Sequence, residues 1–338
     1  MYPLRFQPVF RRYLWGGRGL ATSLNKPIGP EADYAESWEI VDRQSDNSVV
    51  LYGELQGQSL SRLIHDQGER LLGQSVCRRI FDQALPPALQ GRFPLLFKYL
   101  DANRTLSVQV HPDDEIGARL DPPDLGKTEA WYVVDACPDS IIYAGLQEGV
   151  DRNQLRRAVA EGTTDQLLHR IYPTAGDCIF VPAGTVHAIG EGLLIAEIQQ
   201  SSDTTWRLFD WNRVDAAGNP RKLHVDQAIA VIDYQRGPVS VQTPRPGGRP
   251  GEQRLVECEK FGLAVQDCPA GTRTVETGNR LRLLSVIDGE MTISGDPAGK
   301  PLSRGQTALI PACLSLLELQ VPESCRFLDI VVPDDADA

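Results

Sequence analysis

Paired cysteines and long apolar runs are both missing from this chain of 338 residues. Its seven cysteines are scattered, and no two of them are spaced as C-x-x-C. This pattern excludes a zinc site built on paired cysteines and argues against a disulfide framework. Free thiols are typical of a reducing compartment, so we expect a cytoplasmic protein. With no apolar run of about 20 residues, the sequence predicts no membrane-spanning helix.

An excess of positive charge is missing as well. The chain has 45 acidic residues against 34 lysines and arginines, for a formal net charge of −11. This balance argues against nucleic acid or an anionic membrane as the partner. The segment MYPLRFQPVFRRYLWGG lacks the apolar core and cleavage site of a secretory signal. An acidic chain can still bind an anionic metabolite where lysines and arginines are placed locally.

What the sequence does contain is many short apolar runs separated by Gly, Pro and Asp. We expect a mainly β protein with two jelly-roll barrels and a small helical insertion in the N-terminal half. Helical spacing appears at about 59–90 and at 152–171. The expected strands are 37–43, 48–55, 93–100, 106–110, 129–136, 140–146, 178–183, 193–200 and 205–211, followed by at least five more after residue 260.

A stretch rich in Pro and Gly, QTPRPGGRPGEQ at 242–253, has no apolar periodicity and is the best linker candidate. It divides the chain into a predicted N-terminal domain, 1–241, and a predicted C-terminal domain, 254–334.

A weak internal repeat relates the two predicted domains. Five residues separate Gly176 from Pro182 in GDCIFVP, and five separate Gly305 from Pro311 in GQTALIP. The first copy continues as PAGTVH and ends in His187, whereas the second continues as PACLSL and has no histidine. We therefore expect the second barrel to be metal-free, retained for structure or for closing the site.

Three segments carry residues suited to a metal. In LSVQVHPDDE, Gln109 and His111 are two residues apart, so a strand directs both side chains to one face. GKTEAWYVV contributes Glu129, and PAGTVHAI contributes His187. Two imidazoles and a carboxylate form one of the sets of three protein ligands that hold a catalytic zinc, and Gln109 could add a weak fourth ligand through its carbonyl oxygen. Each residue alone also fits an ordinary core or surface role, so the residues alone leave the metal site and these roles evenly balanced.

Basic and acidic groups near these ligands suit an anionic substrate. Lys127 lies two residues before Glu129, hence on the same strand face, and Arg207 lies four residues after Asp203. Such cations can hold a phosphate or stabilise an oxyanion. From its own segment alone, Arg207 is better read as an ion-pair partner of Asp203 or Asp210. The remaining histidines are taken as structural or surface residues: His65, His169 and His224.

The motifs together resemble the zinc-dependent cupin type of mannose-6-phosphate isomerase, in its shorter bacterial form. The resemblance covers most of residues 1–235, and the region after 250 is similar only loosely. Its most specific part is the combination of QVHPDD, KTEAWY and PAGTVHA. The other segments that carry it are YLWGG, AESWEI, EIQQSSDTTWRLFDWNR and GNPRKLHVDQAI.

The resemblance implies one zinc ion per chain, held by His111, Glu129 and His187, with Gln109 nearby or ligating. It implies a catalytic role for Arg207 and substrate-binding or proton-transfer roles for Lys127 and Asp203. Ser107 would lie near the sugar phosphate. The implied reaction interconverts mannose 6-phosphate and fructose 6-phosphate by zinc-assisted proton transfer between C1 and C2.

Two other functions stay open on the sequence alone. One is a cupin that binds a sugar phosphate without converting it, and the presence of Lys127 and Arg207 beside the ligands argues against it. The other is a metal-dependent oxygenase on a cupin scaffold, which normally uses iron held by two histidines and a carboxylate. Metal analysis, oxygen uptake and an isomerase assay would separate the three.

Overall fold

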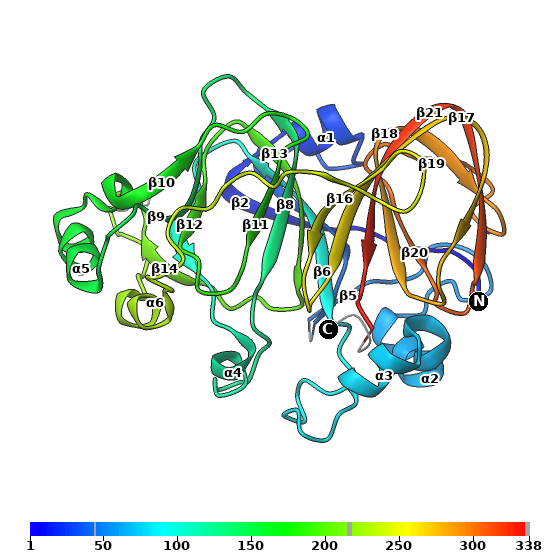
Figure 1. Ribbon diagram of the computed structural model, residues 1–338, viewed down its shortest axis with the longest axis horizontal. Helices are drawn as coiled ribbons and strands as arrows, with labels where there is room; N and C mark the ends of the chain where they lie inside the picture. The colour runs from blue at the N-terminus through cyan, green and yellow to red at the C-terminus, as the bar shows by residue number, and fades with distance from the viewer. Residues whose placement is uncertain (44, 215–217, 335–338) are drawn as a thin grey trace.

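The computed structural model describes residues 1–43, 45–214 and 218–334. It is mainly β, with two β-sheet units side by side and small helices at their edges (Figure 1). The expected fold class, a mainly β protein of cupin type, is confirmed.

The first unit is a sandwich of two antiparallel sheets. The six-stranded sheet has the order β11-β8-β13-β6-β3-β2 and the five-stranded sheet the order β10-β9-β12-β7-β14. Strands of the first sheet are β2 (Val9–Gly17), β3 (Tyr34–Ile40), β6 (Leu95–Ala102), β8 (Glu129–Ala136), β11 (Cys178–Val181) and β13 (Leu193–Gln200). Strands of the second are β7 (Val108–Val110), β9 (Ile142–Leu146), β10 (Leu168–Ile171), β12 (His187–Ile189) and β14 (Trp206–Phe209). A two-stranded pair joins β4 (Asp42–Arg43) to β5 (Asp46–Asn47).

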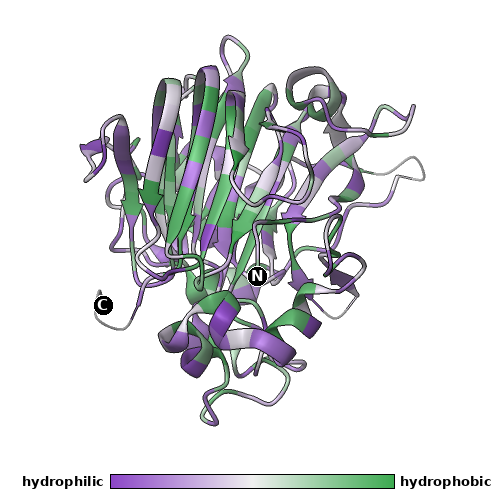
Figure 2. Ribbon diagram, turned by 90° about the vertical axis from the view of Figure 1, so that its right-hand side faces the viewer, coloured by the Kyte–Doolittle hydropathy of each residue, from purple (hydrophilic) through white to green (hydrophobic). Residues whose placement is uncertain are grey.

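The second unit is built on one long, strongly bent sheet of eight strands. Its main order is β1-β20-β18-β21-β17-β16-β15, and β19 pairs with β18. The strands are β1 (Leu4–Arg5), β15 (Arg245–Pro246), β16 (Glu252–Glu257), β17 (Gly262–Glu276), β18 (Arg282–Ile293), β19 (Leu302–Ser303), β20 (Thr307–Ile310) and β21 (Leu316–Val331). Polar and apolar residues are interspersed along these strands, as expected for strands with two different faces (Figure 2).

Short helices surround the sheets. They are α1 (Gly19–Leu24), α2 (Leu60–Leu72), α3 (Gln74–Ile80), α4 (Asp114–Gly117), α5 (Arg152–Glu161), α6 (Val225–Val231) and a 3₁₀ turn at Thr164–Leu167. Helix α2 begins at Ser59, whose side chain accepts a hydrogen bond from the Arg62 amide. Its buried face joins the core against the second unit, and its Leu71 carbonyl accepts from the Ala312 amide. By sequence this helix belongs to the N-terminal half, but in space it supports the C-terminal barrel (Figure 1).

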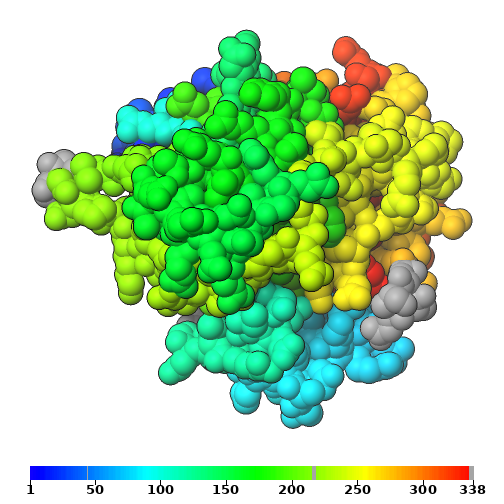
Figure 3. Space-filling view, turned by 60° about the vertical axis from the view of Figure 1, so that its left-hand side comes forward, coloured from blue at the N-terminus to red at the C-terminus, as the bar shows by residue number. Residues whose placement is uncertain are grey.

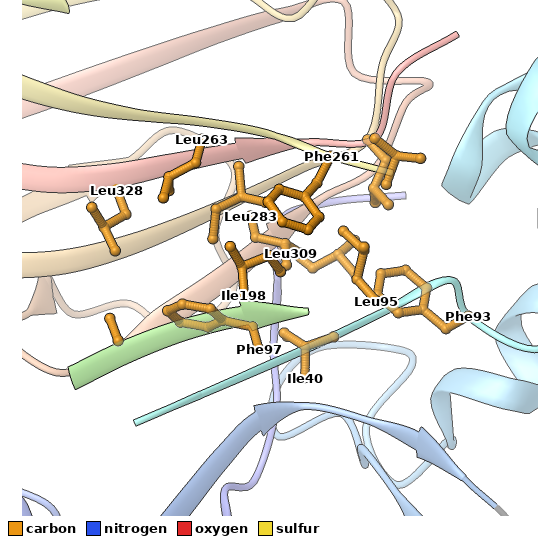
Figure 4. Close-up of a cluster of buried hydrophobic side chains, with 14 of the residues drawn as sticks. Ile40, Phe93, Leu95, Phe97, Ile198, Phe261, Leu263, Leu283, Leu309 and Leu328 are labelled. Atoms are coloured by element: carbon orange, nitrogen blue, oxygen red, sulfur yellow. The ribbon is translucent and has the colours of Figure 1, made fainter. Parts of the chain in front are cut away.

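The two units share a core, because the six-stranded sheet is apolar on both faces. Along β8, Trp131 and Val133 face the interior of the first sandwich, whereas Ala130 and Tyr132 face the second unit. Figure 4 shows side chains of both units packed together, among them Phe97 and Ile198 of the first and Phe261, Leu283 and Leu309 of the second.

Three expected elements differ in the structure. Residues 168–171, expected to be helical, form strand β10, because they complete the edge of the five-stranded sheet against β9. The strand expected at 48–55 is reduced to isolated bridges at Val49 and Val50. The helix expected up to residue 90 ends at Ile80, and the following residues form turns.

The division into domains 1–241 and 254–334 stays a prediction. Within the expected linker, residues 245–246 form β15 and residue 252 begins β16, so this segment supplies the edge of the C-terminal sheet. At the other end of that sheet, β1 pairs with β20 and so brings Leu4 and Arg5 into the second unit. Among the described residues, no helix is long and apolar enough to cross a membrane.

Candidate metal centre

Three strand ends bring the predicted ligands together. His111 follows β7, Glu129 begins β8 and His187 begins β12. His111 Nε2 lies 3.4 Å from Glu129 Oε1, and His187 Nε2 lies 3.7 Å from Glu129 Oε2. One ligand atom from each residue lies within 4.8 Å of the others, and each residue is about 1% exposed. The structure therefore brings the three predicted ligands to one point.

The outer nitrogen of each imidazole is already committed. His111 Nδ1 lies 2.8 Å from the Thr204 carbonyl oxygen, and His187 Nδ1 lies 2.9 Å from that of Thr185. A carbonyl oxygen only accepts hydrogen bonds, so both Nδ1 atoms carry the proton and both Nε2 lone pairs face Glu129. Each backbone carbonyl fixes the ring through Nδ1–H and leaves the Nε2 lone pair available to a metal, as is usual for metal-binding histidines.

Electrostatics keep the three groups in the forms that bind cations. Burial lowers the pKa of His111 well below its ordinary value and also lowers that of His187, so both rings are neutral at pH 7. Burial acts to raise the pKa of Glu129, but the positive charge of Lys127 and its hydrogen bond to the carboxylate act against burial, and the pKa is lowered to about 2. The donor set is thus two neutral imidazoles and a carboxylate, which fits a divalent ion.

The cluster leaves one acceptor without a protein donor. Glu129 Oε2 is buried and has no hydrogen-bond partner among the described residues. The Lys127 ammonium makes an ion pair with Glu129 and lies 3.3 Å from His111 Nε2. The positively charged ammonium of Lys127 therefore lies beside the predicted ligand atoms, which supports the reading of this cluster as a cation site. The Gln109 amide lies 3.3 Å from His187 Nε2, at the edge of the cluster.

The remaining predicted residues line one cavity of about 270 Å³. Ser107, Gln109, Lys127, Asp203 and Arg207 are all on its wall. Arg207 Nε lies 3.3 Å from Ser107 Oγ, and Arg207 Nη1 donates to the Lys222 carbonyl.

The reading of Arg207 as an ion-pair partner of Asp203 or Asp210 is wrong. Asp210 instead pairs with Arg213 and Arg221, and among the described residues Arg207 forms no salt bridge. The guanidinium of Arg207 thus remains on the cavity wall. His224, taken as structural or surface, lies beside it and accepts a hydrogen bond from the Arg207 amide at 3.2 Å.

The sequence reasoning missed a row of buried charges that leads away from the ligands. Glu197 on β13 lies 3.9 Å from Lys127 and 3.2 Å from Lys98 on β6, and Lys98 lies 3.5 Å from Glu36 on β3. The available signal was a charged residue inside each apolar strand, LLIAEIQQ and FPLLFKYL, because a buried charge requires a partner. Which charges meet depends on the register of β13 with β6, where Glu197 pairs with Lys98.

Two aromatic side chains were missed as well. Tyr13 and Trp15 on β2 are stacked, with ring centroids 5.5 Å apart, and both line the cavity beside Glu36 and Lys98. Arg221 adds a further guanidinium to the same wall. The cavity therefore combines an aromatic face, several cations and three carboxylates next to the ligand cluster.

The fold and the site together define a class of protein. It is a two-unit cupin with a buried His-Glu-His centre under a charged cavity. The family model of the phosphomannose isomerase type I catalytic domain matches residues 3–129. The chain is 36% identical to mannose-6-phosphate isomerase ManA of Bacillus subtilis, over 96% of this chain and 97% of that protein. It is 40% identical to mannose-6-phosphate isomerase of Streptococcus mutans, over 91% and 92% of the two chains. The chain belongs to the type I phosphomannose isomerase family.

Structural comparison agrees. The crystal structure of the mannose 6-phosphate isomerase from Bacillus subtilis matches with a TM-score of 0.82 and 28% identity, and the match covers 98% of this chain and 99% of that one. The family resemblance predicted from the motifs is thereby confirmed, including over the C-terminal unit, where the sequence motifs were weakest.

Proposed function

We propose that this protein interconverts mannose 6-phosphate and fructose 6-phosphate. The observation that carries the proposal is the convergence of His111, Glu129 and His187 beneath a cavity lined by Lys127 and Arg207. Membership of the type I family supports mannose 6-phosphate as a substrate, because relatives that match nearly the whole chain are named mannose-6-phosphate isomerases. An aldose–ketose isomerase needs an electrophile at the oxygens, a proton carrier at the carbons and an anchor for the phosphate.

Zinc is the metal we propose for the centre, one ion per chain. His111, Glu129 and His187 would hold it, with Gln109 as a weaker, additional ligand. Bound there, zinc supplies Lewis-acid polarisation of the substrate carbonyl. Zinc is favoured because the site has two imidazoles and one carboxylate and no thiolate.

The chain's own residues supply the proton and the anion contacts. Glu197 is the carboxylate that we propose moves the proton between C1 and C2, in place of the earlier candidates. In the metal-free protein, burial, followed by the negative charge of Glu129, raises its pKa to about 7, and apart from the ion pair with Lys98 its Oε1 has no hydrogen-bond partner among the described residues. A carboxylate with a pKa near the working pH both accepts and returns a proton efficiently.

Lys127 and Asp203 are proposed to assist proton transfer during ring opening. Lys127 is placed for this role because its ammonium lies between His111 and Glu197. Asp203 is exposed at the cavity wall, where the sugar hydroxyls would reach it. Arg207 and Ser107 would hold the anionic end of the substrate, since their side chains contact each other on one side of the cavity.

His111→Ala is expected to remove bound zinc and activity together, since one of three ligands is lost. Metal content by mass spectrometry and turnover of mannose 6-phosphate in a coupled assay measure the two effects. His65→Ala, on the exposed face of helix α2, is the control and should change neither. Full activity in a metal-free His111→Ala protein would refute the ligand assignment.

Arg207→Ala is expected to leave zinc bound while lowering kcat/KM by about 100-fold, the cost of a lost charge-assisted contact to the substrate. Arg213→Ala is the control, because Arg213 is a nearby arginine that pairs with Asp210. Loss of zinc in Arg207→Ala would show that this arginine is structural instead.

The cytoplasmic location also stays a proposal. It is supported by the cysteines, all seven of which are free thiols.

A further inference from the structure

The two barrels repeat the same order of strands. The six-stranded sheet of the first runs β11-β8-β13-β6-β3-β2, and the C-terminal sheet contains the series β20-β18-β21-β17-β16-β15. The sequence repeat GDCIFVP and GQTALIP falls on the first strand of each series, β11 and β20. The two series can therefore be compared residue by residue.

The register identifies the counterpart of the metal carboxylate. In the first barrel Val181, just before Pro182, pairs with Glu129. In the second barrel Ile310, just before Pro311, pairs with Arg282. Arg282 therefore occupies in the second barrel the position that Glu129 occupies in the first, and a carboxylate is replaced by a guanidinium.

The next strand carries the comparison further. Glu129 pairs with Gln199 on β13, and Arg282 pairs with Val331 on β21. Two residues earlier, on the same strand face, stand Glu197 in the first barrel and Asp329 in the second. The counterpart of the proposed proton carrier is thus also an acid.

Asp329 resembles Glu197 in its surroundings as well as its position. Its side chain is about 1% exposed, and its Oδ1 atom, like Oε1 of Glu197, has no hydrogen-bond partner among the described residues. Its Oδ2 atom accepts from Arg282 Nη1 at 2.6 Å and also from Arg249 Nη2. A single buried carboxylate thus orients two guanidinium groups.

These residues border a cavity of about 630 Å³. Its wall includes Arg249, Arg282 and Asp329, together with Ala264, which pairs with Asp329 just as Lys98 pairs with Glu197. Because small Ala264 replaces a lysine, there is more room at this position than in the first barrel. The volume falls within the range of pockets that hold small metabolites.

The charges of this cavity differ from those of the metal centre. Its lining includes four arginines, and it lacks the two histidines of the first site. Glu252, Glu257 and Glu259 also line it and partly offset the positive charge. A ligand must therefore offer an anion to the arginines and hydroxyl groups to the carboxylates, above all to Asp329 Oδ1.

We propose that the C-terminal barrel contains a second, metal-independent binding site for a phosphorylated sugar, in the cavity equivalent to the catalytic one. Arg282 and Arg249 hold the phosphate, and Asp329 accepts a hydrogen bond from a hydroxyl group. The second barrel thus keeps a pocket for the same class of molecule after the charge at its centre has been reversed. This proposal does not rest on the proposed catalysis.

Binding is tested on protein treated with a chelator, so that no turnover occurs. Sorbitol 6-phosphate, which cannot be isomerised, is titrated by calorimetry. Inorganic phosphate, which has no sugar hydroxyl groups, is titrated separately for comparison. We expect two classes of site for sorbitol 6-phosphate. Arg207→Gln should weaken only one, and Arg282→Gln should weaken the other by about tenfold or more, the loss expected for one charge-assisted hydrogen bond.

A second variant tests the same cavity independently, in case Arg282→Gln does not fold. Ala264→Leu fills the cavity and removes no charge, and it should abolish the same class of site. Arg326→Gln is the matched control, since Arg326 lies on β21 outside this cavity and pairs with Asp267. Isomerase turnover of Ala264→Leu should equal that of the unaltered protein. A single class of site that Arg207→Gln removes, or a second class that survives in Ala264→Leu, would overturn the proposal.

Discussion

At the scale of single residues, Glu197 shows how burial and neighbouring charges shift the pKa of a carboxyl group. The side chain lies between Lys98 and Lys127, and burial with the neighbouring Glu129 charge raises its pKa to about 7. Its ordinary value is close to 4.5. Between pH 4.5 and 7 the folded, metal-free protein therefore holds a proton at Glu197 that the unfolded chain has released.

This difference in proton binding makes the free energy of unfolding depend on pH, and the sign of that dependence can be measured. Because the folded state binds the extra proton, the Glu197 contribution to the free energy of unfolding falls as pH rises from 4.5 to 7. Glu197→Gln should remove that part of the slope. Urea unfolding of the chelator-treated proteins at several pH values in this interval tests it. The exposed Glu323→Gln is the control, and identical slopes for Glu197→Gln and the unaltered chain would contradict the assignment.

Residue types and spacing singled out the three residues that cluster in the structure, His111, Glu129 and His187, because each stands in a short motif with its own signal, and the family resemblance implied that they bind a metal. The same reasoning could not find the roles of Glu197 and Lys98. Their strands were predicted, but the partner of each charge depends on a pairing between β13 and β6 that the sequence does not specify. Arg207 was misread from its own segment for a similar reason, since its contact with Ser107 spans 100 positions.

At the scale of elements, one ion pair links the C-terminal barrel to a segment beside the candidate metal centre. Lys260, in the turn between β16 and β17, lies 2.8 Å from Asp114 at the start of helix α4. Asp114 also accepts hydrogen bonds from the Gly126 amide and from Gln200, and Gln200 accepts from the Thr128 amide. The C-terminal unit thus helps to hold the segment that leads into Glu129.

Lys260→Met tests this link. Both partners are about one-third exposed or more, so we expect a loss of less than about 1 kcal/mol in the free energy of unfolding. The change should also weaken zinc binding slightly, as measured by competition with a chelator. Arg119→Met breaks an exposed ion pair with Glu115 beside the same helix and serves as the control. Equal zinc affinity in both variants would show that the link does not reach the centre.

Long elements with regular patterns were predicted better than short ones. Strands such as β6, β8 and β13 were recognised because they are apolar on both faces and eight residues long. Residues 168–171 were misassigned, because a strand of four residues at a sheet edge takes its conformation from the neighbour β9. The residues of the linker likewise gained strand structure from pairing between β15 and β16.

At the scale of the whole molecule, the shared core makes the two barrels one cooperative body. Phe97 is fully buried between them and packs with residues of both (Figure 4). The Tyr99 hydroxyl adds a hydrogen bond of 2.6 Å across the same boundary, to Ser285 Oγ. The surface of the two units is correspondingly continuous in the view of Figure 3.

Phe97→Ala should cost about 3–5 kcal/mol of unfolding free energy, because it opens a hole in this shared core. Calorimetry should still show a single transition at a lower temperature, since both units lose contacts at once. Leu14→Ala, at an exposed position, is the control and should leave the transition unchanged. Two separate transitions in the unaltered protein would contradict a single cooperative body.

The pairing of β1 with β20 has a consequence for biosynthesis. Leu4 and Arg5 are translated about 300 residues before their strand partners, Leu309 and Ala308. Until β20 has been translated, β1 has no strand to pair with, and the C-terminal sheet lacks this edge. This edge of the C-terminal sheet can therefore form only after β20 has been translated, and a chain released before that point would expose unpaired strands to its neighbours as a site for aggregation.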